Sequence, residues 1–317
     1  MNIAEASPPN LSLEIPADST ATPQWFEEAL ATPRREGWVD SAGCPIHYFS
    51  WGDPSKPAVL LLHGFLAHAR CFAFIAPFLA REYYVVAYDF SGMGDSGVRE
   101  EYPDEVRLQE LMDVARGTGL FDNGRKPSII AHSYGCTIGL LAMERCHEQF
   151  SRLVICDLMT LRPERLGAHT KESGPPGSQD PQRPNRIYPD YVAAKGRYVL
   201  APPQKVNEPY LFDYMAYHSL KEVEGGWTWK FHPSVFGRND DFHERMLAQG
   251  RRIASAPGPI VIVYGEESVL FDADSADYVR ECGGGHIPMI GIPDARHHLM
   301  LDQPLAFASV LKTILVM

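Results

Sequence analysis

Short apolar runs alternate with helical patterns along the first half of the chain. The runs that read as strands lie at residues 44–52, 58–64, 83–89, 127–132 and 152–157. Several of them are continuously apolar, which indicates strands buried on both faces. Helical spacing of apolar residues is found at about 71–80, 103–118 and 134–146. This alternation predicts an α/β fold with a mostly parallel central sheet and helices on both faces.

The alternation stops after residue 157 and resumes near residue 259. The segment between is rich in Pro, Gly and aromatic residues and offers helical runs but no convincing buried strand. We interpret residues 158–255 as an inserted, mainly helical cap. Two further strands, at 259–265 and 286–293, and two helices, at 272–282 and 304–316, complete the pattern, with Asp272 as the N-cap of the first helix.

The predicted organisation is therefore a core made of residues 23–157 and 256–317, interrupted by the cap. Residues 1–22 are rich in Pro, Ser and Ala, which predicts a flexible N-terminal arm.

Composition and charge exclude several classes of partner. The chain has 317 residues, with 40 acidic and 29 basic ones, and a net charge of −11. No basic cluster is visible, which argues against nucleic acid. There is no apolar run long enough to span a membrane and no signal-peptide pattern, so we expect a cytoplasmic protein without a membrane partner, either monomer or homodimer. The expected partner is a small-molecule substrate.

The sequence also lacks the patterns of common cofactor and metal sites. The six cysteines are scattered without a CxxC pair, which predicts reduced thiols and no zinc site. The glycine-rich SGMGDSG stretch is not followed by the Lys-Ser/Thr pair of a phosphate loop, and no HExxH spacing occurs. We therefore expect neither a cofactor nor a metal.

A serine stands at the junction of a predicted strand and helix in IIAHSYGCTIGL, residues 129–140. Small neighbours, Ala131 and Gly135, allow a strained turn that would expose the hydroxyl of Ser133 at the carboxyl edge of the sheet, where ligands of such sheets bind. The simpler alternative is a serine that caps the helix. A nucleophilic serine needs a base, and His297 and His298 follow the last predicted strand, whereas the neighbouring His132 should point away from Ser133.

Four motifs together carry a resemblance to a known family. LLHGF, DFSGMGDSG, AHSYG and RHHLMLDQP stand in the order and spacing of the α/β-hydrolase fold family, and they resemble its capped, esterase-like branch. The match covers about 25–157 and 255–317, with Ala131 where the family usually has glycine. GGWTWKFHP is similar to a segment near the end of many caps in this branch.

The resemblance implies a role for five residues. Ser133 would be the nucleophile and His297 the general base, and the backbone N–H groups of Phe65 and Tyr134 would form the oxyanion hole. DFSGMGDSG resembles the family's structural turn, with Asp89 as a buried carboxylate.

The acid behind the histidine is where this sequence departs from the family pattern. Many relatives carry an aspartate shortly after the strand equivalent to 259–265, but this run reads GEESV. Some members place the acid after the preceding strand, which here is Asp157. We favour Asp157 as the acid that orients the histidine, with Glu267 as the alternative, because Asp272 is explained as a helix cap.

These residues predict a serine hydrolase that cleaves a carboxylic ester or lactone through an acyl-enzyme. The aromatic cap suggests an apolar or aromatic substrate of small to medium size, with Leu66, His132, Trp227 and Trp229 as pocket candidates. Two alternatives remain: a carbon–carbon bond hydrolase that uses the same triad on a diketone, and a non-catalytic ligand-binding member of the fold. A serine nucleophile disfavours the epoxide hydrolase and dehalogenase chemistry that the family runs with aspartate.

Overall fold

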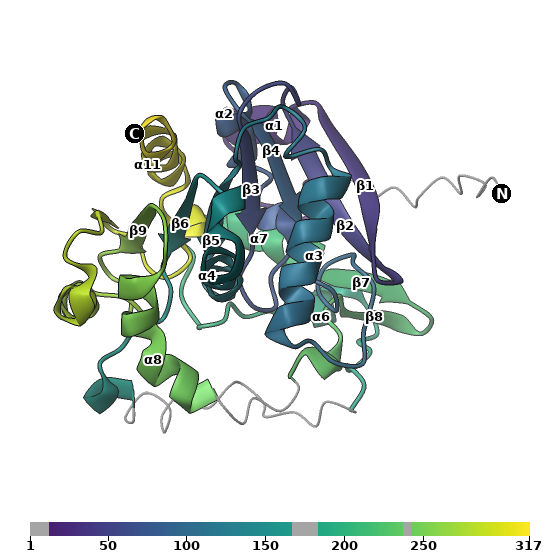
Figure 1. Cartoon of the computed structure of the whole chain (residues 1–317). Helices are drawn as coiled ribbons and strands as arrows, with labels where there is room; N and C mark the ends of the chain where they lie inside the picture. Colours follow the sequence, from purple (N-terminus) through teal and green to yellow (C-terminus); the bar gives the residue numbers. More distant parts are fainter. Residues whose placement is uncertain (1–12, 167–182, 237–241) are drawn as a thin grey trace.

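The computed structural model describes residues 13–166, 183–236 and 242–317, and the described residues form one large central sheet (Figure 1). Its eight strands are β1 (Arg34–Ser41), β2 (Cys44–Trp51), β3 (Ala58–Leu62), β4 (Tyr84–Tyr88), β5 (Ser128–His132), β6 (Arg152–Cys156), β9 (Ile260–Gly265) and β10 (Met289–Ile292). They lie in the order β1-β2-β4-β3-β5-β6-β9-β10. Strands β4, β3, β5, β6, β9 and β10 are parallel, whereas β1 and β2 pair antiparallel at one end. The predicted α/β class with a mostly parallel sheet is confirmed.

The seven strands predicted from apolar runs are present, whereas β1 was not predicted. Strand β1 reads RREGWVDS, and only Ser41 in it is buried. It is an edge strand that pairs with β2 alone, so it needs no apolar face. The hairpin that joins it to β2 turns at Ala42 and Gly43, which both have positive φ, as a tight two-residue turn requires.

Side chains that alternate along the strands belong to two separate hydrophobic clusters, one on each face of the sheet. Val59 and Leu61 of β3 belong to one buried cluster, while Leu60 and Leu62 belong to the other, as expected of a strand covered on both faces. One layer contains α1 (Gln24–Ala31), η1 (Ala69–Phe72), α2 (Ala76–Ala80), α10 (Leu299–Asp302) and α11 (Pro304–Val316), and the other contains α3 (Asp104–Gly117), α4 (Tyr134–Cys146), α8 (Phe242–Ser255) and α9 (Ala273–Val279). The helix predicted at 71–80 is instead the pair η1 and α2. No helix in the described ranges is long and apolar enough to cross a membrane.

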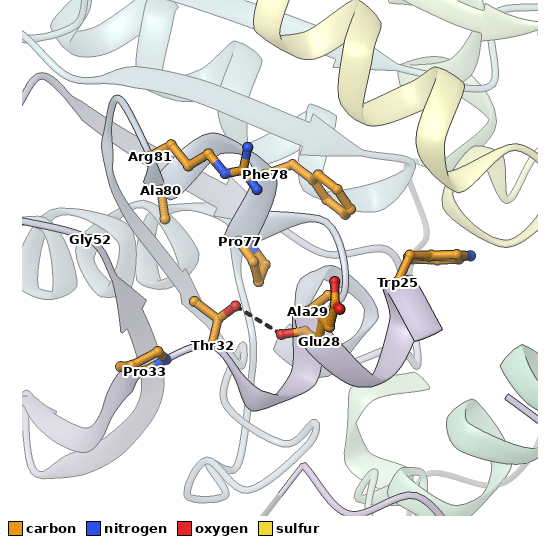
Figure 2. A pocket seen from close by; sticks show the side chains of 10 residues that line it. All are labelled: Trp25, Glu28, Ala29, Thr32, Pro33, Gly52, Pro77, Phe78, Ala80 and Arg81. Carbon is orange, nitrogen blue, oxygen red and sulfur yellow. Dashed lines mark hydrogen bonds between the residues drawn. The ribbon is translucent and has the colours of Figure 1, made fainter. Parts of the chain in front are cut away.

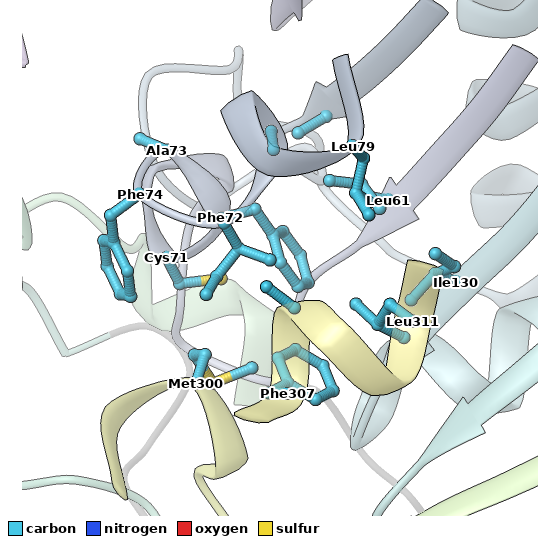
Figure 3. Packing of buried hydrophobic residues seen from close by; sticks show 14 of the residues in the cluster. Leu61, Cys71, Phe72, Ala73, Phe74, Leu79, Ile130, Met300, Phe307 and Leu311 are labelled. Carbon is cyan, nitrogen blue, oxygen red and sulfur yellow. The ribbon is translucent and has the colours of Figure 1, made fainter. Parts of the chain in front are cut away.

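The first layer is shown in Figure 3. Leu61 and Ile130 of the sheet pack in one cluster with Phe72, Leu79 and Leu311 of α11, and all five side chains have no solvent exposure. Segments far apart in the sequence thus close over the same strands. The C-terminal helix is therefore part of the core that supports the sheet.

The insertion between β6 and β9 contains helices and a hairpin. Its elements are α6 (Tyr191–Lys195), α7 (Pro209–His218), β7 (Leu220–Val223), β8 (Gly226–Trp229) and η3 (Pro233–Phe236), followed by α8. The hairpin is a difference from the expected, mainly helical insertion. The Gly225-Gly226 turn makes it possible, because Gly226 has φ 138° and a Cβ there would lie 1.9 Å from the Tyr188 carbonyl oxygen. The boundaries 158–255 for a cap remain a prediction.

The described part of the expected N-terminal arm is docked. Leu13 is buried, and the Glu14 carbonyl accepts a hydrogen bond from His218 Nε2 at 3.0 Å. Asp18 forms an ion pair with Lys195 at 2.8 Å, and Thr20 N–H donates to Asp213 at 3.2 Å. Residues 13–22 therefore pack on α6 and α7, while residues 1–12 lie outside the described residues.

A pair of leucines on α11 tests this packing. Leu311 has no solvent exposure and Leu305 is 44% exposed. We expect Leu311→Ala to lower the free energy of unfolding by roughly 2–5 kcal/mol, because it leaves a cavity in the first layer. Leu305→Ala, measured in the same urea titration, should stay within about 0.5 kcal/mol of wild type. Equal effects of the two substitutions would contradict the packing described for this helix.

Candidate active site

Five loops meet at the carboxyl edge of the parallel strands. They follow β3, β5, β6, β9 and β10, and they carry Phe65, Ser133, Asp157, Ser268 and His297 in that order. Ligands of open α/β sheets bind outside this edge. The fold therefore gathers residues that are as much as 232 positions apart in the sequence (297 − 65) into one place.

Ser133 lies in a strained turn between β5 and α4. Its backbone has φ 52° and ψ −120°, a conformation that costs about 1–3 kcal/mol for a residue other than glycine. Two hydrogen bonds hold the turn, from Ser133 N–H to the Cys156 carbonyl at 3.0 Å and from Cys136 N–H to the Ser133 carbonyl at 2.9 Å. Gly135, two residues after Ser133, has no room for a side chain, because a Cβ there would lie 2.7 Å from the Leu62 carbonyl oxygen.

A chain of two hydrogen bonds connects Ser133, His297 and Asp157. The Ser133 hydroxyl lies 3.0 Å from His297 Nε2, and His297 Nδ1 donates to Asp157 Oδ1 at 2.7 Å. The imidazole and the carboxylate are almost entirely buried. The geometry is that of a nucleophile, a base and an acid that orients the base.

The Asp157 carboxylate accepts three hydrogen bonds, from the end of β9 and from the segments that follow β9 and β10. Besides His297, Oδ1 accepts a hydrogen bond from the Ser268 hydroxyl at 2.7 Å, and Oδ2 accepts one from Gly265 N–H at 3.0 Å. Glu267, the alternative acid, is exposed to solvent, and the hydrogen bond of His297 Nδ1 goes to Asp157. The structure thus brings Asp157, and not Glu267, into contact with the histidine.

Ser268 was not singled out in the sequence. It stands three residues after Gly265, where many relatives carry an aspartate, so the signal was a small polar residue in the position of an acid. Its hydroxyl oxygen also accepts hydrogen bonds from Leu270 N–H at 3.2 Å and Phe271 N–H at 3.4 Å. Ser268 therefore fixes the loop after β9 to the carboxylate.

The backbone N–H groups of Phe65, in the loop after β3, and of Tyr134, the first residue of α4, are the predicted oxyanion donors. Among the described residues, the N–H groups of Phe65 and Tyr134 donate to no backbone carbonyl. The loop that carries Phe65 is held by the hydrogen bond from Ala67 N–H to the Gly64 carbonyl at 3.2 Å, with Leu66 in a positive-φ conformation. Tyr134 begins α4, so its N–H lies at the positive end of a helix dipole. Both groups are free to bind an anion.

His132 and His298 flank the site as neutral side chains. His132 Nε2 donates to the His297 carbonyl at 2.8 Å, so this histidine holds the backbone of its neighbour across the strand ends. Burial lowers the pKa of His132 to about 3, and burial also lowers the pKa of His298 well below its usual value. Neither ring carries a charge near neutral pH.

A cavity of about 350 Å³ lies beside these residues, between the sheet edge and the insertion. The pocket candidates Leu66, His132 and Trp229 line it, and so does Phe65. The fourth pocket candidate, Trp227, is not among the residues that line this cavity. Trp227 precedes Trp229 by two positions in β8 and packs on Tyr191, with ring centroids 5.3 Å apart.

A second hollow, of about 360 Å³, lies on the outside of the first helical layer (Figure 2). It is formed by α1, α2 and the adjoining turns, with Trp25, Glu28, Phe78 and Arg81 among its lining residues. None of the residues of the candidate active site lines it. Its position away from the carboxyl edge separates it from the chemistry described above.

One group of side chains has the composition of a metal site. His47, Asp89 and Asp95 offer ligand atoms within 4.8 Å of one another. Arg70 forms an ion pair with Asp95, and Lys230 Nζ lies 2.7 Å from the same carboxylate. These cations already neutralise the carboxylates, so the group is a buried ion-pair network that supports the loop after β4. Asp89, as expected, has a structural role there: its carboxylate accepts hydrogen bonds from the backbone of Ala69 and Asp95.

Comparison with known proteins agrees with the fold. Residues 59–310 match the alpha/beta hydrolase family. Epoxide hydrolase 3 of Xenopus tropicalis is 29% identical over 120 residues, which cover 37% of this chain and 32% of the relative. A human serine hydrolase-like protein is 31% identical over 110 residues, covering 34% of this chain and 53% of the relative. The chain thus spans about a third to a half of the length of these curated relatives.

The solved structure of the thioesterase domain from the curacin biosynthetic pathway has a similar fold. It superposes with a TM-score of 0.70 at 22% identity and covers 89% of this chain and 100% of that domain. The sequence match spans most of the chain, and the sheet order, the strained serine turn and the hydrogen-bonded Ser133, His297 and Asp157 accompany it. The chain belongs to the alpha/beta hydrolase family.

Proposed function

We propose that this protein is a serine hydrolase that cleaves a carboxylic ester or lactone through an acyl-enzyme. The observation that carries the proposal is the hydrogen-bonded chain from Asp157 through His297 to the strained Ser133. The human relative described as serine hydrolase-like gives independent support.

The geometry supports a mechanism in two halves. Nε2 of His297 takes the proton of Ser133 as the hydroxyl attacks the substrate carbonyl, and Asp157 stabilises the imidazolium that forms. The N–H groups of Phe65 and Tyr134 stabilise the oxyanion of the tetrahedral intermediate. His297 then protonates the leaving alcohol, and a water activated by the same histidine releases the acid from Ser133.

The identity of the nucleophile argues against opening of an epoxide, the reaction in the name of the Xenopus relative. A carboxylate that attacks an epoxide forms an ester, which water can hydrolyse. The hydroxyl of Ser133 would form an ether, which this site cannot cleave. Acyl transfer is the reaction in which a serine nucleophile can be regenerated.

The cavity supports a small to medium substrate with apolar or aromatic parts. Aromatic rings contribute much of its wall, including Phe65, Tyr198, Trp229 and Phe236. A volume of about 350 Å³ lies near the lower end of small-molecule pockets. A screen of esters, lactones and diketones would separate ester hydrolysis from the carbon–carbon bond alternative.

Covalent labelling tests the nucleophile. A fluorophosphonate probe should modify the wild-type protein at Ser133, because the His297 base activates this hydroxyl. Ser133→Ala should abolish labelling and lower kcat on a p-nitrophenyl ester at least about 10⁴-fold. The control is Ser309→Ala, which removes an exposed hydroxyl on α11 and should label like wild type. Peptide mapping of the label to any other residue would refute the assignment.

Two carboxylate variants test the acid. Asp157→Asn should lower kcat by up to about 10⁴-fold, because the amide stabilises the wrong imidazole tautomer and not the imidazolium. Glu267→Gln should leave kcat within about twofold of wild type, because that side chain is exposed and the hydrogen bond of His297 Nδ1 goes to Asp157. The reverse order of effects would overturn the role of Asp157.

Substitution of Ser268 tests whether its hydrogen bond helps to position the Asp157 carboxylate. Ser268→Ala removes one of the two donors to Asp157 Oδ1, and we expect kcat to fall roughly tenfold, the value of a hydrogen bond to a charged group. KM should change little, because Ser268 does not line the cavity. Ser268→Thr keeps the hydroxyl and should restore most of kcat. Unchanged kcat in Ser268→Ala would mean that His297 and Gly265 suffice to position the carboxylate.

A further inference from the structure

The cavity lined by Phe65, and by His132 and His298 next to the candidate catalytic residues, differs in charge from the rest of the chain. Its lining includes one permanently charged side chain, Arg197, and no aspartate or glutamate among the described residues. The chain as a whole is acidic, with a net charge of −11. The two lining histidines, His132 and His298, add no charge because burial keeps them neutral. Arg197, which is exposed to solvent at the cavity, is therefore the one permanently charged side chain among its lining residues.

Arg197 also differs from the neighbouring cations of the insertion. Lys195, two residues earlier, forms ion pairs with Asp18 at 2.8 Å and Asp213 at 2.9 Å. Lys230, just after β8, pairs with Asp95 at 2.7 Å. For Arg197 no ion pair or hydrogen bond of the side chain occurs with the described residues, although it begins the lining segment 197–201. Lys195 and Lys230 are thus paired with carboxylates, whereas Arg197 has no such partner among the described residues and is available at the cavity.

The surroundings of Arg197 suit a substrate with one charged end. The lining is otherwise mainly apolar or aromatic, including Tyr198, Leu200 and Trp229. A second guanidinium, that of Arg186, lies 5.4 Å from the ring centroid of the lining residue Tyr188. An arginine presents a planar set of donors that matches a carboxylate with two parallel hydrogen bonds. The positive charge next to an apolar wall favours a molecule that is apolar along its length and anionic at one end.

We propose that Arg197 binds a carboxylate of the substrate, so that the preferred substrates are esters with an apolar body and a free carboxylate. The inference rests on the proposed hydrolase function and specifies its substrate class. Arg197 acts in binding and specificity, and the reacting atoms remain those of Ser133, His297 and the oxyanion donors.

Matched substrates test the proposal on both sides of the scissile bond. Mono-p-nitrophenyl glutarate carries the carboxylate on the acyl side, and p-nitrophenyl pentanoate is its neutral counterpart. Para-acetoxybenzoate carries it on the alcohol side, and phenyl acetate is its neutral counterpart. Monoesters of adipate and suberate vary the distance between the ester and the carboxylate. We expect the wild-type kcat/KM to favour the anionic member of at least one pair.

The variants should remove this preference selectively. Arg197→Gln should raise KM for the preferred anionic ester roughly three- to tenfold and change KM for its neutral counterpart much less. High salt should reduce the wild-type preference for the anionic ester, because it screens the charge of Arg197. Arg197→Lys keeps the charge but loses the planar set of donors, so its KM should lie in between. Arg125→Gln is the control for net charge, because Arg125 is exposed at the opposite, amino-terminal end of β5.

A binding measurement separates this proposal from the hydrolase function. Isothermal titration of the wild type and Arg197→Gln with phenylbutyrate and phenylbutyramide does not depend on turnover. Tighter binding of the acid in the wild type alone supports the role of Arg197 even if no ester is cleaved. Equal binding of acid and amide, with no preference in any ester pair, overturns the proposal. In that case fluorophosphonate labelling of Ser133 still decides whether the protein is a hydrolase.

Discussion

A carboxylate without solvent exposure holds the candidate site together. Burial of a charge is costly unless its oxygens find donors, and Asp157 finds them on the loops after β9 and β10. Each donor comes from a different point of the chain, so the carboxylate can be satisfied only when β6, β9 and β10 lie in their final order. The arrangement that positions the His297 imidazole is thus the same arrangement that makes the burial of Asp157 tolerable.

The strained backbone conformations at the site also depend on hydrogen bonds between neighbouring strand ends. Three of the five non-glycine residues with positive φ in the described chain are Leu66, Ser133 and Asp157, which all stand directly at the carboxyl edge. Such conformations persist only where the surrounding structure enforces them. Here the enforcement comes from hydrogen bonds between strand ends, such as those from Ser133 N–H to Cys156 and from Asp157 N–H to Val263 at 2.8 Å. The parallel sheet supplies the rigidity that the turns require.

The sequence predicted most of the sheet, because buried parallel strands are continuous apolar runs. It did not predict β1 or the β7–β8 hairpin, whose exposed residues leave no such run, and for them the turn glycines Gly43 and Gly226 were the better signal. Ser133 and His297 could be identified as candidates from local motifs. The choice between Asp157 and Glu267 is a matter of distance across strands, and the cavity is assembled from segments as remote as Phe65 and Met300. Neither property exists along a single stretch of sequence, which is why Ser268, Arg197 and the position of Trp227 were missed.

The docked residues 13–22 have a mechanical consequence. They connect α1, which packs in the core, to α6 and α7 of the insertion through Glu14, Asp18 and Thr20. The chain therefore crosses from core to insertion a third time, in addition to the two connections that follow β6 and precede β9. An insertion connected to the core only at two neighbouring strand ends can rotate about them as a hinge. Additional contacts with residues 13–22 restrict that rotation. Residues 13–22 therefore hold the insertion, which contributes to the cavity wall, against the core.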